Sequence, residues 1–254
     1  MADLSDRVVI VTGASSGIGR ATSEALAAAG ARVVCAARRV DRLEDLKQRI
    51  ESAGGTALTC PCDVTDREQV RTMVDTTRQA FGRIDGLVNN AGIMPLAPMV
   101  KTRMDDWDQC IDVNVKGLLY CIGCVLPVML EQASGHIVNI SSVAGRRPFA
   151  AAAVYSGTKA AVHSLSEGLR NELATLSEKD GNRIRVSVIA PGVTETELTE
   201  SIADDKTRKQ VQEYFSSMRD PLKSEDIAQA ILYAMASPEH VNVNEILVRP
   251  TSQV

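Results

Sequence analysis

The sequence has no strong excess of charge of either sign and no basic stretch. Its 254 residues include 28 Lys and Arg and 32 Asp and Glu, which gives a formal net charge of -4. Domains that bind nucleic acids usually carry basic residues clustered on one face. The charge therefore argues against a nucleic-acid partner. Hydrophobic residues at 44% and charged residues at 24% are ordinary for a globular α/β domain of this length.

Long hydrophobic runs are also missing. The first residues, Met-Ala-Asp-Leu-Ser-Asp-Arg, do not contain the apolar stretch of a signal peptide. The most apolar segment, residues 117–130, is too short to span a bilayer and contains Pro127. We therefore expect a soluble, cytoplasmic protein that has no membrane partner.

The six cysteines offer neither a disulfide framework nor a metal site. Cys121 and Cys124 form a C-x-x-C inside a helical pattern, whereas a redox pair normally lies at a helix N-terminus, where the thiolate is stabilised. Four suitably spaced zinc ligands cannot be assembled from the sequence. We interpret the cysteines as buried, reduced thiols and expect no metal.

Short β-branched runs alternate with amphipathic helical patterns, which is typical of βαβ units around a parallel sheet. The predicted strands cover residues 7–12, 32–37, 56–62, 85–88, 136–140, 183–190 and 245–249. The predicted helices cover residues 16–29, 41–53, 66–81 with Asp66 as N-cap, 107–132 with a bend at Pro127, and 154–176. Right-handed crossovers then predict a single α/β domain over residues 1–254. This is a Rossmann-type doubly wound fold, a seven-stranded parallel sheet with helices on both faces.

Residues 194–223 interrupt this alternation. The segment is polar, charged and weakly helical, and it lies between the sixth strand and the last helix. Long insertions of this kind are often active-site lids. We expect this segment to cover a substrate.

A glycine-rich turn follows the first strand directly. It reads Thr-Gly-Ala-Ser-Ser-Gly-Ile-Gly over residues 12–19 and opens a helix. Glycines let backbone amides approach phosphate oxygens, and the helix N-terminus adds a partial positive charge. The spacing is G-x-x-x-G-x-G, not the commoner G-x-G-x-x-G. The strand–turn–helix context favours a dinucleotide site over the alternative, a turn that only packs the helix on the strand.

The end of the second strand indicates which dinucleotide is bound. NAD sites usually place an acidic residue there, on the ribose hydroxyls. Here the strand runs into Arg38 and Arg39, and the first acid is Asp41. A guanidinium can bind the 2′-phosphate of NADP through two hydrogen bonds, so we predict NADP(H), with Arg38 as the main ligand. The alternative is that both arginines only solvate the start of the next helix.

Tyr155 and Lys159 are four residues apart on a predicted helix and so share a face. A nearby lysine cation should lower the pKa of the tyrosine, which could then exchange a proton with a substrate oxygen. A Y-x-x-x-K pair also occurs by chance on surface helices. Here it is accompanied by polar or glycine-containing motifs, most of which follow predicted strands: residues 89–92, Asn114, residues 141–142 and residues 191–192.

Together these motifs resemble the short-chain dehydrogenase/reductase family over essentially the whole chain. The resemblance implies a catalytic set of Asn114, Ser142, Tyr155 and Lys159. Ser142 is chosen over Ser141 because it lies thirteen residues before the tyrosine. The implied cofactor-binding residues are Gly13, Ser15, Ser16, Gly17, Ile18, Gly19, Arg38, Arg39, Asp63, Val64, Asn90, Ala91, Gly92, Tyr155, Lys159, Pro191, Gly192, Val193, Thr194 and Thr196.

A narrower likeness is to a bacterial NADP-dependent branch of this family, carried by residues 37–39 and 238–251. That branch includes 3-hydroxy-acid (serine-type) dehydrogenases, clavulanic-acid dehydrogenase and general carbonyl reductases. It implies a carbonyl reductase or alcohol dehydrogenase and a homotetramer that pairs through two long helices. The apolar face of residues 118–130 fits such pairing or simple core burial equally well.

The substrate pocket is expected to be mostly apolar, with Met94, Val143, Arg146, Arg147 and Phe149 around it. Arg146 and Arg147 follow the Ser142 loop and could bind a substrate carboxylate, or they could simply be solvated. Two other functions remain open. A non-catalytic NADPH-binding protein would not need the complete catalytic set. A sugar-nucleotide epimerase usually has a substantial C-terminal domain, and only about sixty residues follow Gly192.

Overall fold

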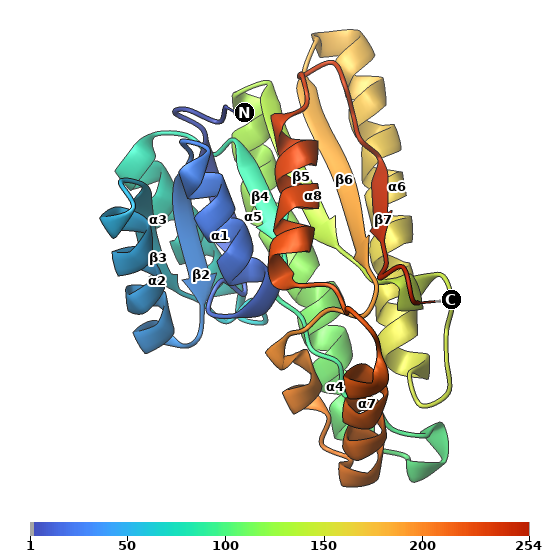
Figure 1. The fold of residues 1–254 in the computed structure, drawn as a ribbon. Helices are drawn as coiled ribbons and strands as arrows, with labels where there is room; N and C mark the ends of the chain where they lie inside the picture. The colour runs from blue at the N-terminus through green and yellow to red at the C-terminus, as the bar shows by residue number, and fades with distance from the viewer. Residues whose placement is uncertain (1–2, 254) are drawn as a thin grey trace.

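A seven-stranded parallel sheet organises the molecule, as predicted (Figure 1). The structure is a computed structural model that describes residues 3–253. The strand order is β3-β2-β1-β4-β5-β6-β7, and every neighbouring pair is parallel. The strands are β1 (Val8–Thr12), β2 (Arg32–Ala37), β3 (Thr56–Pro61), β4 (Gly86–Asn89), β5 (Ser134–Ile140), β6 (Arg183–Pro191) and β7 (Glu245–Val248).

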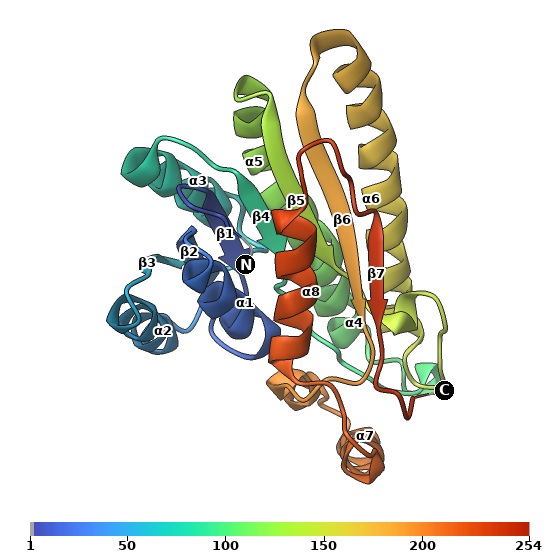
Figure 2. The same ribbon diagram turned by 45° about the horizontal axis from the view of Figure 1, so that its top comes forward.

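Helices cover both faces of the sheet (Figure 2). Val9 and Val11 of β1 pack in a cluster with α1 (Gly17–Ala28), α2 (Val40–Ser52) and α8 (Ser224–Ala236). Val8 and Ile10 pack on the other face with α3 (Arg67–Phe81), α5 (Leu118–Glu131) and α6 (Ala153–Asp180). Successive side chains of a strand point to opposite faces, so a central strand buried on both sides is a continuous apolar run.

The long helix predicted over residues 107–132 is interrupted. It begins as α4 (Met104–Ile111), passes through a π-helical segment, η2 (Asp112–Gly117), and continues as α5 with Pro127 inside it. π-Helical turns are rare and are frequently found at functional sites. The combined helix, residues 104–131, is long and apolar enough by length and composition to cross a membrane, a test that core helices also pass. Here Cys121, Val125 and Met129 are buried in the core cluster.

The segment between β6 and α8 is more ordered than its sequence predicted. It contains a short 3-10 helix, η4 (Glu197–Ser201), and α7 (Asp205–Ser217), which Asp204 caps by accepting a hydrogen bond from the Thr207 amide. Ile202 is fully buried in a third apolar cluster that includes Tyr155 and Met94. Ile202 is therefore one of the side chains that anchor this segment to the rest of the domain.

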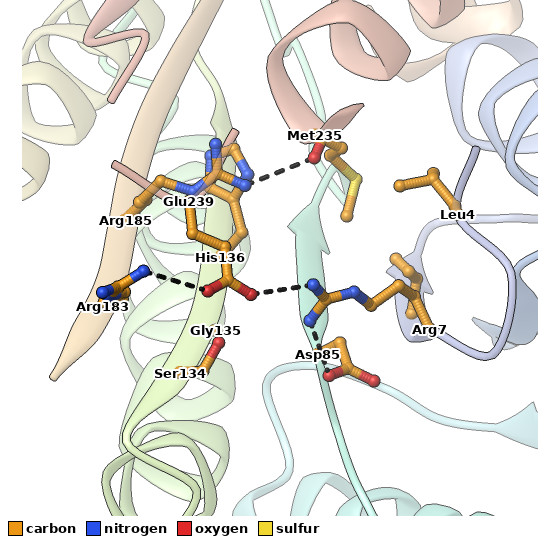
Figure 3. A pocket seen from close by; sticks show the side chains of 11 residues that line it. Leu4, Arg7, Asp85, Ser134, Gly135, His136, Arg183, Arg185, Met235 and Glu239 are labelled. Atoms are coloured by element: carbon orange, nitrogen blue, oxygen red, sulfur yellow. Dashed lines mark hydrogen bonds and ion pairs between the residues drawn. The ribbon is translucent and has the colours of Figure 1, made fainter. Parts of the chain in front are cut away.

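The amino-terminal edge of the sheet is closed by ion pairs (Figure 3). Arg7 bonds both Asp85, at 3.3 Å, and Glu239, at 2.8 Å, and Arg183 lies 3.8 Å from Glu239. The cavity among these side chains measures only about 30 Å³. This cavity is too small for an organic ligand, and ligands of open α/β sheets bind at the carboxyl ends of the strands.

Candidate active site

The glycine turn after β1 lies directly against the loop after β4. Gly13 has a φ of +65°, and a Cβ there would lie 2.9 Å from the Cα of Ala91. At Gly19 a Cβ would lie 2.3 Å from the carbonyl oxygen of Gly13. A larger residue at either position would push the turn out of place. The turn therefore needs its glycines for packing, and it leads into the N-terminus of α1, where backbone amides suit a phosphate.

Thr12, which was not among the predicted site residues, joins the two loops. Its Oγ1 accepts hydrogen bonds from the amides of Asn90 and Ala91, both at 3.1 Å. The Asn90 side-chain amide donates back to the Thr12 carbonyl oxygen at 2.9 Å. The signal in the sequence was a polar residue closing a fully apolar strand. These bonds set the position of residues 90–92, which were predicted to face the cofactor.

Arg39, and not Arg38, reaches the glycine turn. Its Nε and one terminal nitrogen donate to Ser15 Oγ at 3.1 and 3.0 Å, and it bonds Ser16 Oγ at 2.7 Å. Arg38 is exposed and lines a different hollow. The serines of the turn therefore bond Arg39, whereas Arg38 as the main ligand of the 2′-phosphate stays a prediction. Adjacent residues diverge at the end of a strand, so the sequence alone could not choose between them.

The hollow beside Arg38 has a volume of about 320 Å³. It lies between the ends of β2 and β3 and the α4–η2 helix, and its rim is acidic. Its lining includes Asp63, predicted to meet the adenine, whereas the neighbouring Val64 is buried and packs on Gly117. The full lining is Arg38, Asp63, Thr65, Asp105, Asp108, Gln109, Asp112 and Val113.

Tyr155 and Lys159 lie near the start of α6 and are both buried, with 5% and 6% of their surface exposed. The Lys159 Nζ lies 5.9 Å from the centroid of the Tyr155 ring and donates to the carbonyl oxygen of Ile140 at 2.8 Å. Ser141 Oγ donates to the Lys159 carbonyl oxygen at 2.8 Å. The end of β5 therefore fixes both the backbone and the side chain of the lysine.

Ser142 and Tyr155 face each other across the site. Burial raises the pKa of Tyr155 to about 12, and a hydrogen bond with Ser142 acts in the opposite direction but is weaker. The expectation that the protein's own groups lower this pKa is therefore wrong, because desolvation of the phenolate outweighs them. Burial also lowers the pKa of Lys159 to about 8. The lysine still carries its proton at neutral pH.

Asn114 lies in the π-helical segment and is 2% exposed. Its Oδ1 accepts from the Ile93 amide and its Nδ2 donates to the Ile93 carbonyl oxygen, both at 2.9 Å. Nδ2 also lies 3.1 Å from Thr158 Oγ1, which donates to the Tyr155 carbonyl oxygen at 2.7 Å. The side chain thus links the loop after β4 to the helix that carries Tyr155.

Gly92 lies where these groups meet. A Cβ on Gly92 would be 3.3 Å from Asn114 Oδ1 and 3.5 Å from Lys159 Nζ. The loop that packs on the glycine turn therefore also borders the lysine. The four predicted catalytic residues and the predicted phosphate turn form one continuous site.

The predicted substrate residues divide into two groups. Met94 is buried, and its amide donates to Ser201 Oγ of η4 at 2.8 Å. Val143 is half-buried in the Ser142 loop, whereas Arg147 and Phe149 are exposed. Arg146 forms a two-pronged ion pair with Glu245 of β7. A substrate carboxylate would have to compete with Glu245 for Arg146, and its binding there stays a prediction.

The segment after β6 reaches the glycine turn. Val193 and Leu222 pair through a backbone hydrogen bond of 3.1 Å, and the Val193 amide donates to the Gln253 side chain at 3.0 Å. Thr196 lies over Gly17, where a Cβ would be 3.2 Å from its methyl carbon. Pro191, Gly192 and Thr194 lead from β6 into this contact. Over residues 3–253, no group of three His, Cys, Asp or Glu side chains is placed to hold a metal ion.

Residues 7–207 match the short chain dehydrogenase family. The chain is 45% identical to an uncharacterized oxidoreductase of Staphylococcus saprophyticus, over 100% of this chain and 99% of the relative. It is similar to the closed form of a serine dehydrogenase complexed with NADP+, with 34% identity, a TM-score of 0.87, and 97% and 96% of the two chains covered.

A second structural neighbour carries the other nicotinamide dinucleotide. It is a short chain dehydrogenase/reductase from Burkholderia phymatum in complex with NAD, with 27% identity, a TM-score of 0.87, and 97% and 90% of the two chains covered. The fold, the site and these likenesses agree. The chain belongs to the short-chain dehydrogenase/reductase family and is an NAD(P)-binding oxidoreductase.

Proposed function

We propose that this oxidoreductase interconverts a carbonyl compound (an aldehyde, a ketone or a 3-oxo acid) and the corresponding alcohol, with NADP(H) as cofactor. One observation carries the proposal. Tyr155, Ser142 and Lys159 converge at the carboxyl edge of the sheet, and residues 90–92 connect them to the glycine turn. A proton-transfer group next to a phosphate-binding turn is the arrangement that hydride transfer to a carbonyl requires.

The preference for NADP(H) rests on the end of β2. The strand itself does not end in a carboxylate that could bond a ribose 2′-hydroxyl, because Ala37 is followed by two arginines. Arg39 and the hydroxyls of Ser15 and Ser16 form one cluster of donors beside the turn. Guanidinium and hydroxyl donors suit a dianionic phosphate. The serine dehydrogenase with bound NADP+ supports this choice, and the neighbour with bound NAD makes the direct measurement necessary.

A bound nicotinamide ring would donate or accept the hydride. Tyr155 then gives a proton to the substrate oxygen as its negative charge develops, or takes one in the reverse direction. Ser142 donates a hydrogen bond to the same oxygen and keeps it next to the phenol. The Lys159 cation stabilises the phenolate left on Tyr155, and its bond to Ile140 holds it in place.

The pKa of Tyr155, raised to about 12, favours one direction of the reaction near neutral pH. The phenol is fully protonated there, so it is ready to act as an acid. Carbonyl reduction needs that acid, whereas alcohol oxidation needs the phenolate. At neutral pH reduction therefore has its proton donor in place, whereas oxidation depends on the small population of phenolate.

Residues 194–223 act as a lid over this site in the proposal. Thr196 contacts the glycine turn, Ser201 bonds the Met94 amide, and Ile202 packs in the cluster that contains Tyr155. These contacts exclude water from the region around the tyrosine. Exclusion of water strengthens every electrostatic interaction in the site.

A substrate panel tests the proposal. Aldehydes, ketones and 3-oxo acids are assayed with NADPH and with NADH, and the matching alcohols with NADP+ and NAD+, by the absorbance of the reduced cofactor. We expect turnover with NADPH that the Tyr155→Phe variant loses. No turnover anywhere in the panel, despite NADPH binding, would indicate a non-catalytic binding protein. Higher kcat/KM with NADH would overturn the cofactor assignment.

A further inference from the structure

The lid carries a carboxylate that occupies the proposed phosphate site. Glu197 opens η4, directly after Thr196, and its side chain lies between two arginines of the β2–α2 region. Its Oε2 lies 2.8 Å from a terminal nitrogen of Arg39, and its two oxygens accept from Arg42 at 2.6 and 2.8 Å. One acid of the lid thus pairs with two cations, Arg39 at the N-cap of α2 and Arg42 in its first turn.

Arg39 divides its donors among three side chains. Its Nε and one terminal nitrogen bond Ser15 and Ser16, and the other terminal nitrogen bonds Glu197. Both arginines lower the pKa of Glu197, so this side chain is an anion at neutral pH. A phosphate that binds at Ser15 and Arg39 must therefore displace this carboxylate or lie beside it. Displacement breaks the Glu197–Arg39 pair, and binding beside the carboxylate places two anions on one guanidinium.

We propose that Glu197 is a specificity-determining residue of the lid, whose carboxylate competes with the ribose 2′-phosphate for Arg39. The inference rests on the proposed preference for NADP(H). A dinucleotide without the 2′-phosphate brings no anion to this position and leaves the Glu197–Arg39 pair intact. A dinucleotide with the phosphate takes Arg39, and Glu197 keeps only Arg42. Binding of the 2′-phosphate and closure of the lid at residue 197 therefore oppose each other.

The competition should change the affinity for the 2′-phosphate only modestly. The side chains of Glu197, Arg39 and Arg42 are each about 40% exposed, at 38%, 40% and 42%. Water and salt screen charges at such positions, and exposed pairs contribute little individually. We expect removal of the carboxylate to tighten binding of a 2′-phosphate by about three- to ten-fold, the scale of one or two such interactions.

Glu197→Gln tests the proposal, because the amide keeps the shape of the side chain and removes its charge. Glu195→Gln is the matched control, since Glu195 is an exposed lid carboxylate with the same charge and no side-chain hydrogen bond to either arginine. Calorimetry measures the Kd of adenosine 2′,5′-diphosphate and of AMP, which differ only by the 2′-phosphate. NADPH and NADH are titrated in parallel.

We expect Glu197→Gln to bind adenosine 2′,5′-diphosphate and NADPH about three- to ten-fold more tightly, with less than a two-fold change for AMP and NADH. Glu195→Gln should match the wild type with all four ligands. An unchanged or weaker affinity of Glu197→Gln for the 2′-phosphate ligands would overturn the proposal. If the wild type binds the diphosphate no more tightly than AMP, the cofactor assignment itself fails, which is a separate outcome.

Hydrogen exchange of the lid gives a second readout. Competition at Arg39 predicts that adenosine 2′,5′-diphosphate accelerates amide exchange in residues 197–201 of the wild type, whereas AMP does not. Glu197→Gln lacks the charged pairs with Arg39 and Arg42, so without ligand it should already exchange faster in this region. Slower exchange with the diphosphate would mean that the phosphate and the lid close together, and it would contradict the proposal.

Discussion

Asn114 and Ile93 are joined by two hydrogen bonds of 2.9 Å that run in opposite directions, from the Ile93 amide to Oδ1 and from Nδ2 to the Ile93 carbonyl oxygen. The asparagine side chain thereby bonds both backbone groups of Ile93, as a neighbouring strand would in a sheet. The loop after β4 approaches the cofactor turn and Lys159 through Gly92, the residue before Ile93. The buried amide therefore determines where that loop lies.

Asn114→Ala should lower both stability and turnover. Both backbone groups of Ile93 lose a partner in a partly buried site, which costs about 1–3 kcal/mol. Chemical denaturation and kcat measurements check this. Asn171→Ala, on the exposed side of α6, is the control and should stay within about 0.5 kcal/mol of the wild type. Unchanged stability of Asn114→Ala would show that the two bonds contribute little.

Tyr155→Phe should lower turnover by about 10²- to 10⁴-fold and leave the Kd for NADPH nearly unchanged. The ring still fills its place in the apolar cluster with Met94 and Ile202, so the fold is retained. Steady-state kinetics and fluorescence titration of NADPH provide the two readouts. Near-normal turnover of this variant would rule out Tyr155 as the proton donor.

The two directions of the reaction should differ in pH dependence. Burial keeps the pKa of Tyr155 near 12, above its ordinary value of 10, so raising the pH increases the phenolate population only in the alkaline range. Alcohol oxidation should therefore accelerate steadily from pH 7 to pH 10, while carbonyl reduction gains nothing. Initial rates in both directions across this range check the prediction. A pH-independent oxidation rate would argue against a tyrosine base.

Arg39→Ala should weaken NADPH binding more than Arg38→Ala does. Only Arg39 bonds the serines of the glycine turn, and a hydrogen bond to a charged group contributes about 1.5–3 kcal/mol, or roughly 10- to 150-fold in affinity. NADH binding should change little in either variant. The measurement is kcat/KM for both cofactors at a fixed substrate concentration. A larger loss in Arg38→Ala would identify Arg38 as the phosphate ligand.

Lys159 should make stability depend on pH in the cofactor-free protein. Its pKa falls from an ordinary 10.5 to about 8 on burial, so between these values the unfolded chain binds more protons than the folded one. Stability contributed by this group therefore rises as the pH increases from 8 to 10.5. Lys159→Met removes that rise. From pH 8 to 10.5 the unfolding free energy of the wild type should therefore increase relative to that of Lys159→Met. A constant difference between the two proteins would contradict the lowered pKa of Lys159.

Much of the fold follows from short-range patterns in the sequence. β2 occupies Arg32–Ala37 as predicted, because a short uninterrupted apolar run is typical of a strand covered on both faces. Asp66 caps α3 as predicted, since its carboxylate accepts from the amides of Glu68 and Gln69. The four-residue spacing of Tyr155 and Lys159 likewise predicted that the two side chains share a helical face, and both are buried on α6.

The tertiary structure decided which charges meet. Glu197 pairs with Arg39 across 158 residues, and Glu245 pairs with Arg146 across 99, so no local pattern relates these partners. The same holds for the pKa of Tyr155, because desolvation depends on the whole surrounding core. Local sequence determines strands, caps and helical faces through contacts within a few residues. Partner choice among arginines and the cost of burying a phenol depend on groups that only folding brings together.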